Sequence, residues 1–156
     1  MLIGDWLARR ADLTPHKVAL LDAAGGLRPI TFRQWNANVS RTARFLAERF
    51  GVQRGDRVAV LAMNCVAYLD IWFACGKLGA ILQNLNWRLT PTELAGLIAD
   101  AEPTLLIYGP EFVEQVRALR SAVRCVALDA NRRADPDDAV FAERDAFADV
   151  PLPAVD

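Results

Sequence analysis

The sequence predicts an α/β fold: a mainly parallel sheet of repeated βα units with helices on both faces, plus a small N-terminal hairpin. The main observation is a series of short apolar runs of strand length, at residues 57–62, 80–85, 104–108 and 125–128. Their starts fall roughly 20–24 residues apart, which is the spacing of strands that alternate with helices. Because no sequence repeat accompanies this spacing, the pattern is typical of a doubly wound sheet and not of a solenoid.

The stretch 55–90 contains the unit on which this prediction depends. Its first apolar run, 57–62, is uninterrupted and partly β-branched, as in a strand that is covered on both faces. Asn64 is placed to cap a helix over 65–78, and Gly79 is placed to end it. A second apolar run follows at once, so the three elements form a βαβ unit, whose connection is almost always right-handed.

The first 30 residues carry signals for a helix and a hairpin. Residues 2–11 show a short amphipathic pattern that predicts a helix. Residues 18–22 and 28–30 are the two arms of a predicted hairpin, with Gly25 and Gly26 in its turn. We expect this hairpin to lie apart from the main sheet or at its edge.

Two capping boxes mark the starts of later helices. Thr31 with Gln34 opens a helix that is expected to run to about residue 50. Thr90 with Glu93 opens another helix, which has Pro91 at its first position. In both cases the hydroxyl and the longer polar side chain each satisfy a backbone N–H that the first helical turn leaves free.

Composition divides the chain into two parts. Residues 1–128 contain the regular apolar runs and form the predicted N-terminal α/β subdomain. Residues 129–156 are more polar, and they are read as a charged loop at 131–138, a short helix at 139–147 and an extended tail from 150 to 156.

The overall composition limits which cell compartment and which kinds of partner we expect. The 156 residues include 18 basic and 19 acidic ones, which gives no electrostatic reason to expect a nucleic acid or an anionic membrane as partner. No run approaches the roughly 20 apolar residues that span a bilayer, and the N-terminus lacks the order of a signal peptide. The three cysteines, Cys65, Cys75 and Cys125, lie in apolar runs, where small buried side chains in a reducing cytoplasm explain them better than disulfides or metal ligands. We therefore expect a cytoplasmic protein.

Nucleotide, nucleophile and metal motifs are almost absent from the sequence. No G-x-G-x-x-G motif and no G-x-x-x-x-G-K-[ST] motif occurs, and the Gly25-Gly26 pair is better explained by the hairpin turn than by a phosphate site. Ser40 and Ser121 fall on predicted helices, outside any nucleophile elbow. His16 is the one histidine, which excludes a catalytic triad and a multi-histidine metal site and leaves a surface residue as the default.

Asp70 is the acid that most invites a catalytic interpretation. It lies on a predicted helix that is otherwise almost wholly apolar, so a carboxyl group with a tuned pKa is conceivable. We favour a plainer interpretation, a solvent-facing stripe formed by Ala67, Asp70, Ala74 and Lys77.

Four aromatic residues are candidates for lining an acyl or aryl pocket: Trp35, Tyr68, Trp72 and Trp87. Trp35 and Trp72 recur at core spacing, so packing is the favoured role for both. Trp87 follows a strand end in a loop, where a role in a pocket or an interface is better founded.

Several short pieces in a fixed order resemble the N-terminal part of the adenylate-forming enzymes, which include acyl-CoA synthetases, luciferases and nonribosomal adenylation domains. The pieces are Thr31-Phe32, Gly51-Val52, Gly55-Asp56-Arg57-Val58-Ala59, Asn64, Gly79-Ala80, and Leu85-Asn86-Trp87-Arg88-Leu89-Thr90-Pro91 with Glu93-Leu94. The last piece is most similar to the acyl- and aryl-CoA synthetases. The resemblance covers about residues 2–109.

This resemblance implies an enzyme that activates a carboxylate with ATP and passes the acyl group to coenzyme A, with Mg²⁺ as the metal. The family's phosphate-binding loop, ribose-binding aspartate and catalytic lysine are expected after residue 156, so no catalytic, cofactor-binding or metal residue is carried over onto this chain. Asn64, Asn86 and Arg88 match the family pattern, and we expect structural roles for them, as a helix cap and as loop-fixing contacts.

The sequence thus predicts an N-terminal fragment of a fatty-acyl- or aryl-CoA synthetase that is inactive alone. The alternative is a stand-alone, non-catalytic α/β binding or interaction module, because a fold does not fix a function. The expected partner is the remainder of the parent synthetase. We also expect self-association, as a homodimer, through apolar residues near the tail or the Trp87 loop.

Overall fold

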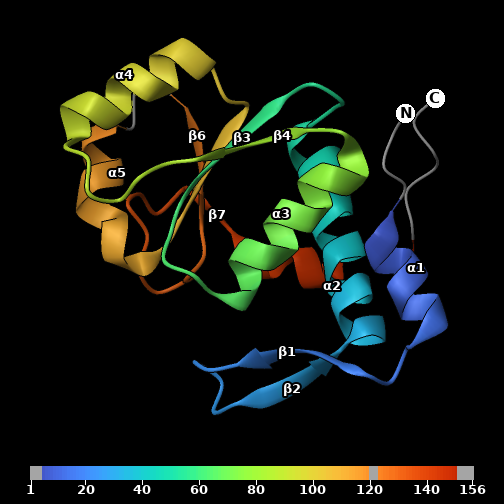
Figure 1. The fold of residues 1–156 in the computed structure, drawn as a ribbon. Helices are drawn as coiled ribbons and strands as arrows, with labels where there is room; N and C mark the ends of the chain where they lie inside the picture. The colour runs from blue at the N-terminus through green and yellow to red at the C-terminus, as the bar shows by residue number, and fades with distance from the viewer. Residues whose placement is uncertain (1–4, 120–122, 151–156) are drawn as a thin grey trace.

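A five-stranded parallel sheet forms the centre of the molecule (Figure 1). The structure is a computed structural model that describes residues 5–119 and 123–150. The strand order is β4-β3-β5-β6-β7, and every neighbouring pair is parallel. The strands are β3 (Arg57–Leu61), β4 (Ile81–Asn84), β5 (Leu105–Tyr108), β6 (Arg124–Ala127) and β7 (Ala139–Val140). The four predicted strands are therefore confirmed.

The N-terminal hairpin is a separate two-stranded sheet, as predicted. Its strands, β1 (Val18–Asp22) and β2 (Arg28–Thr31), pair antiparallel below the helices in Figure 1. Gly26 has a φ of +72°, which a glycine adopts without strain. The carboxylate of Asp22 accepts a hydrogen bond from the Gly25 N–H at 3.1 Å. The glycine pair thus serves the turn.

The helices lie in two layers, one on each face of the sheet. The described helical elements are α1 (Trp6–Leu13), α2 (Phe32–Arg44) with the π-helical turn η1 (Phe45–Arg49), α3 (Val66–Leu78), α4 (Pro91–Ala101), η2 (Pro110–Phe112), α5 (Val113–Leu119) and η3 (Phe141–Ala146). Both predicted capping boxes are present: the Gln34 N–H donates to Thr31 Oγ1 and the Glu93 N–H to Thr90 Oγ1, each at 3.3 Å.

Alternation along the strands supplies an apolar core to each layer. On β3, Val58 and Val60 point to the core shared with α2 and α3, whereas Ala59 and Leu61 point to the core shared with α4 and α5. All four side chains are fully buried. A strand covered on both faces must be apolar at every position, which explains the uninterrupted run in the sequence.

The exposed and buried sides of α3 differ from the prediction. Asp70 and Ala74 are fully buried and the Lys77 side chain is only 9% exposed, whereas Trp72, predicted to be core, is 56% exposed. The solvent stripe predicted for α3 is therefore wrong. Because α3 is apolar nearly all round, its sequence gives no contrast from which to choose the exposed side.

Asn64 does not cap α3. The residue at the N-cap position is Cys65, and no side chain there accepts a hydrogen bond from the first turn. Gly79 does end the helix, in the left-handed conformation with a φ of +68°.

The C-terminal part contains one strand that the sequence did not predict. Residues 139–147 were expected to be a single helix, but Ala139 and Val140 pair with β6 and the 3₁₀-helix η3 follows. At the other end α1 begins at Trp6 and ends at Leu13, and residues 2–4 of the predicted helix lie outside the described residues.

Candidate functional site

The strand order places a topological switch point between β3 and β5. The helix after β3, α3, packs with α2 on one face of the sheet, whereas η2 and α5, after β5, pack on the other (Figure 1). Ligands of open parallel sheets bind at such a point, outside the carboxyl ends of the strands. The residues there are 62–65 and 109–111, and we refer to them as the switch point.

Close backbone approach shapes the switch point. The N–H of Gly109 donates to the carbonyl of Leu61 at 2.9 Å. A Cβ atom on Gly109 would lie 3.4 Å from the Cβ of Ala62 and 2.7 Å from Oε2 of Glu111. A side chain at this position would have to displace the Glu111 carboxylate, so glycine leaves room for that carboxylate beside the two strand ends.

The charge of the switch point does not suit a triphosphate. It contains one acidic side chain, the exposed Glu111, and no basic residue. Burial raises the pKa of the Cys65 thiol, and the nearby carboxylates of Asp70 and Glu111 raise it further, so the thiol stays protonated at neutral pH. Within the described ranges, no three His, Cys, Asp or Glu side chains group closely enough to hold a metal ion. These residues alone therefore do not fit ATP with Mg²⁺.

The loop after β4 is held by its own polar residues. Asn86 Oδ1 accepts a hydrogen bond from the Arg88 N–H at 3.1 Å, in agreement with the loop-fixing role predicted for Asn86. The Arg88 guanidinium lies 4.5 Å from the centre of the Trp87 ring, a cation–π contact. Trp87 remains 42% exposed, so this loop offers an aromatic surface.

An apolar cavity of about 480 Å³ lies between the hairpin and the start of α3. Leu20 and Leu21 of β1 line one side, and Cys65, Tyr68 and Trp72 line the other. Two of the four candidate aromatic residues thus meet at one cavity, whereas Trp35 is buried in the core and Trp87 lies in the β4 loop.

The remaining candidates behave as ordinary structural residues. His16 is exposed and Ser40 is buried on α2, while Ser121 lies outside the described residues. Cys75 and Cys125 are buried and Cys65 is half-buried, and the described cysteines form no disulfide. No helix in the described ranges has the length and apolarity to cross a membrane.

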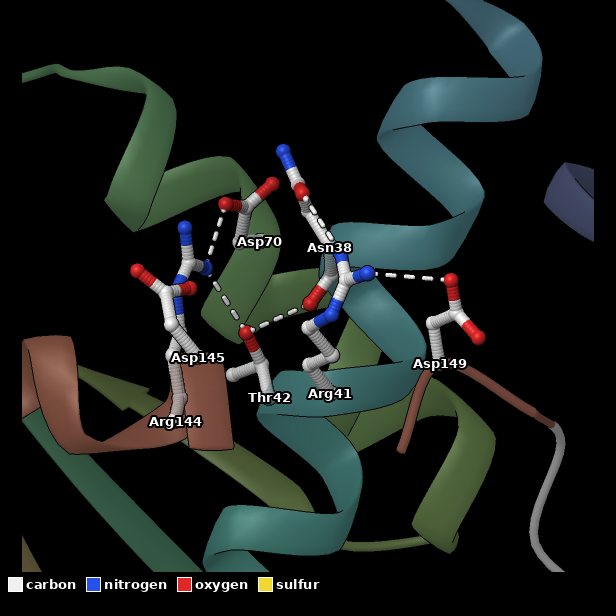
Figure 2. A network of polar contacts seen from close by, with 7 residues as sticks. All are labelled: Asn38, Arg41, Thr42, Asp70, Arg144, Asp145 and Asp149. Carbon is white, nitrogen blue, oxygen red and sulfur yellow. Dashed lines mark hydrogen bonds and ion pairs between the residues drawn. The ribbon is translucent and has the colours of Figure 1, made fainter. Parts of the chain in front are cut away.

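The most unusual polar arrangement is a buried ion pair between α3 and η3 (Figure 2). Arg144 Nη1 donates to Asp70 Oδ2 at 2.6 Å and to Thr42 Oγ1 at 2.8 Å, and the Thr42 hydroxyl donates to the Asn38 carbonyl at 2.9 Å. The Arg144 guanidinium also lies 4.5 Å from the centre of the Phe141 ring. Sequence reasoning identified Asp70 as a candidate acid but missed its partner, which is 74 residues away.

Burial dominates the electrostatics of Asp70. Desolvation raises the pKa of its carboxyl group to about 6, against the lowering effect of Arg144. Asp70 Oδ1 and the Trp35 indole N–H are both buried without a hydrogen bond of ordinary geometry, yet the indole also lowers the pKa of Asp70. The indole N–H thus stabilises the carboxylate without making a full hydrogen bond to it.

Similarity to known proteins assigns the family. The chain matches the model of the AMP-binding enzymes over residues 7–155. The chain belongs to the AMP-binding enzyme family. This agrees with the resemblance seen in the sequence and with the parallel sheet.

Relatives of this chain are CoA ligases that are much longer than it is. It is 39% identical over 136 residues to a feruloyl-CoA synthase of an Amycolatopsis species, covering 87% of this chain and 27% of that protein. It is 37% identical over 128 residues to an indoleacetate–CoA ligase of Aromatoleum aromaticum, covering 82% and 24%. A solved fatty acyl CoA synthetase of Mycobacterium tuberculosis shares the fold with a TM-score of 0.80 at 27% identity, over 97% of this chain and 30% of that one. The chain thus spans about a quarter of the length of the curated relatives it matches.

Proposed function

We propose that this chain is the N-terminal part of an acyl-CoA synthetase. In the proposed reaction, a substrate carboxylate attacks the α-phosphorus of ATP and pyrophosphate leaves. The thiol of coenzyme A then displaces AMP from the acyl-adenylate. The family match over residues 7–155 is the observation that carries this proposal.

Within that reaction, we propose an aryl or arylalkyl carboxylic acid as the substrate, with a fatty acid as the alternative. The relatives at 39% and 37% identity are named for feruloyl and indoleacetate groups, and one at 32% is named for long-chain fatty acids. Because the switch point lacks basic residues, the groups that hold ATP and Mg²⁺ are proposed to come from outside this chain, and the chain alone is proposed to be inactive.

The test uses the complete open reading frame that encodes this chain. We expect it to continue beyond residue 156 and its product to release pyrophosphate with ATP, Mg²⁺ and one of ferulate, indoleacetate or palmitate, and then to form the CoA thioester. The 156-residue chain, assayed in parallel, should release none. A reading frame that stops at residue 156, together with no pyrophosphate release, would favour the non-catalytic binding module instead.

The proposed partner of this chain is the remainder of the synthetase. Large apolar side chains are exposed on neighbouring elements: Trp6 on α1, Leu21 on the hairpin and Trp72 on α3. Trp6 and Trp72 both contact the ring of Phe73, at centroid distances of 5.9 and 6.3 Å, and Leu21 and Trp72 line the same cavity. A homodimer, predicted from the sequence to form near the tail or the Trp87 loop, is the alternative, and light scattering of the isolated chain distinguishes a dimer from a monomer.

A further inference from the structure

Residues 139–149 form a strap that crosses the C-terminal half of α2 and reaches α3. The strap begins as β7 at the sheet edge, where it pairs with β6. Two of its aromatic rings, those of Phe141 and Phe147, pack on Phe45 of η1. Their ring centroids lie 6.1 and 5.8 Å from that of Phe45. Apolar contacts at residues 141 and 147 therefore attach the strap to η1.

The polar contacts of the strap are of two kinds. Arg41 donates to Asp149 at 3.0 Å and Arg49 lies 3.7 Å from Glu143, but these partners are solvent-exposed. Exposed pairs contribute little because water screens them. The third contact, Arg144 with Asp70, joins a fully buried carboxylate to a guanidinium that is 14% exposed. The protonation state of Asp70 is thus the polar property that most affects how firmly the strap is attached.

We propose that a proton on Asp70 controls how firmly the strap is attached to α2 and α3, so that attachment is firmer in mild acid and weaker above neutral pH. The geometry that carries this proposal is a carboxylate fully buried under the strap, with one oxygen held by the strap's arginine and the other without a hydrogen bond.

The direction follows from which state binds the proton more tightly. With the strap attached, burial outweighs Arg144 and the pKa of Asp70 rises to about 6. When the strap lifts, water reaches the carboxyl group and its pKa returns toward the ordinary 3.8. The attached state is therefore favoured below the ordinary pKa, and this advantage is lost as the pH rises through about 6.

The other groups that face Asp70 do not reverse this direction. From η3, Arg144 lowers its pKa and Asp145 raises it. From α2, the neighbours are the neutral Trp35 and Thr42, since Arg41 reaches Asp149 instead (Figure 2). At the N-cap of α3, burial raises the pKa of the Cys65 thiol, which stays neutral at neutral pH, and on α3 itself the Lys77 ammonium pairs with Asp5.

The experiment is hydrogen exchange by NMR on the amides of residues 141–147 between pH 5 and 8, with each rate divided by the intrinsic rate of that amide. We expect protection to fall by about 10-fold as the pH rises across this range, because each pKa unit corresponds to a factor of ten and only about one unit of the shift lies above pH 5. Asp70→Asn keeps the shape of the side chain but carries no titrating proton, so its strap protection should not change with pH.

Asp149→Asn is the matched control, because it removes an exposed carboxylate from the same strap. Its protection should be slightly lower at every pH, with the slope of the unchanged chain. Equal slopes in Asp70→Asn and the unchanged chain would overturn the proposal, as would protection that increases with pH. A carboxyl ¹³C titration of the unchanged chain adds a test without a variant: a midpoint near 4 for Asp70 also overturns it.

Discussion

The two faces of the sheet hold the C-terminal residues by polar contacts of opposite character. On the α4/α5 face, the Tyr108 hydroxyl donates to Asp138 Oδ2 at 2.8 Å and accepts from the Ala134 N–H at 2.6 Å. On the α2/α3 face, Asp70 accepts a hydrogen bond from Arg144 on one oxygen, and its other oxygen is buried without a hydrogen bond of ordinary geometry. Both contacts fix the chain that follows β6, one through the buried neutral hydroxyl of Tyr108 and the other through the buried carboxylate of Asp70.

This difference shows where the fold is sensitive to its surroundings. A neutral hydroxyl whose donor and acceptor are both used loses little on burial, whereas a buried carboxylate retains a desolvation penalty that its partner must offset. We therefore expect the α2/α3 face to respond more strongly to charge changes and to pH than the α4/α5 face does.

The largest effect should come from Arg144→Met, which leaves Asp70 buried beside an apolar side chain. Removing one partner of a buried ion pair costs about 3 kcal/mol of unfolding free energy at pH 7.5. The loss should shrink at pH 5, because Asp70 is then protonated. Urea unfolding followed by tryptophan fluorescence measures both values.

Arg41→Met is the control for that variant, since Arg41 pairs with an aspartate that is 50% exposed. Its expected cost is below about 1 kcal/mol. If the two variants lost equal unfolding free energy, the buried Asp70 pair would contribute no more than an exposed pair. That result would contradict the proposed difference between the two faces.

Tyr108→Phe should give a smaller loss, about 1–2 kcal/mol, because it leaves the Ala134 N–H and the Asp138 carboxylate without their shared partner. Burial raises the pKa of Tyr108 far above neutrality, so this loss should be the same at pH 5 and pH 8. A loss that changes with pH as much as that of Arg144→Met would contradict the view that this face responds less strongly to pH.

Helix caps give the smallest effect and test whether the two faces differ in anything besides buried charge. Thr31→Ala on α2 and Thr90→Ala on α4 each remove one capping hydroxyl and should each cost about 1 kcal/mol. Asn64→Ala serves as the control, with a change within about 0.5 kcal/mol, because Asn64 caps no helix. Thermal unfolding of the three variants side by side checks this order.

Much of the fold was readable from local patterns, and the parts that were missed depend on distant contacts. The strands β3 to β6 were predicted because each is a short apolar run, and α2 and α4 because their capping boxes use neighbouring residues. The two-residue strand β7 is too short to give a pattern. Its pairing depends on β6, which the local sequence of 139–147 does not reveal.

The candidate site was less predictable for the same reason. The switch point exists only because β5 pairs with β3 on the side away from β4. No single segment of the sequence specifies this strand order. The burial of Asp70 depends on Arg144, and an apolar helix offers no clue to which of its sides that arginine will cover. The resemblance to adenylate-forming enzymes, in contrast, rested on short motifs in a fixed order, and the family match over residues 7–155 confirmed it.

Strand β4 has a consequence for handling the isolated chain. It is the outermost strand of the sheet beside β3, it contains no charged residue, and its Ile81 is 51% exposed. Natural edge strands are usually blunted by lysine, proline or a bulge, because an open row of backbone groups templates further strands. Concentrated solutions of this chain should therefore form β-sheet-rich aggregates through this edge. An Ile81→Lys substitution should prevent this aggregation.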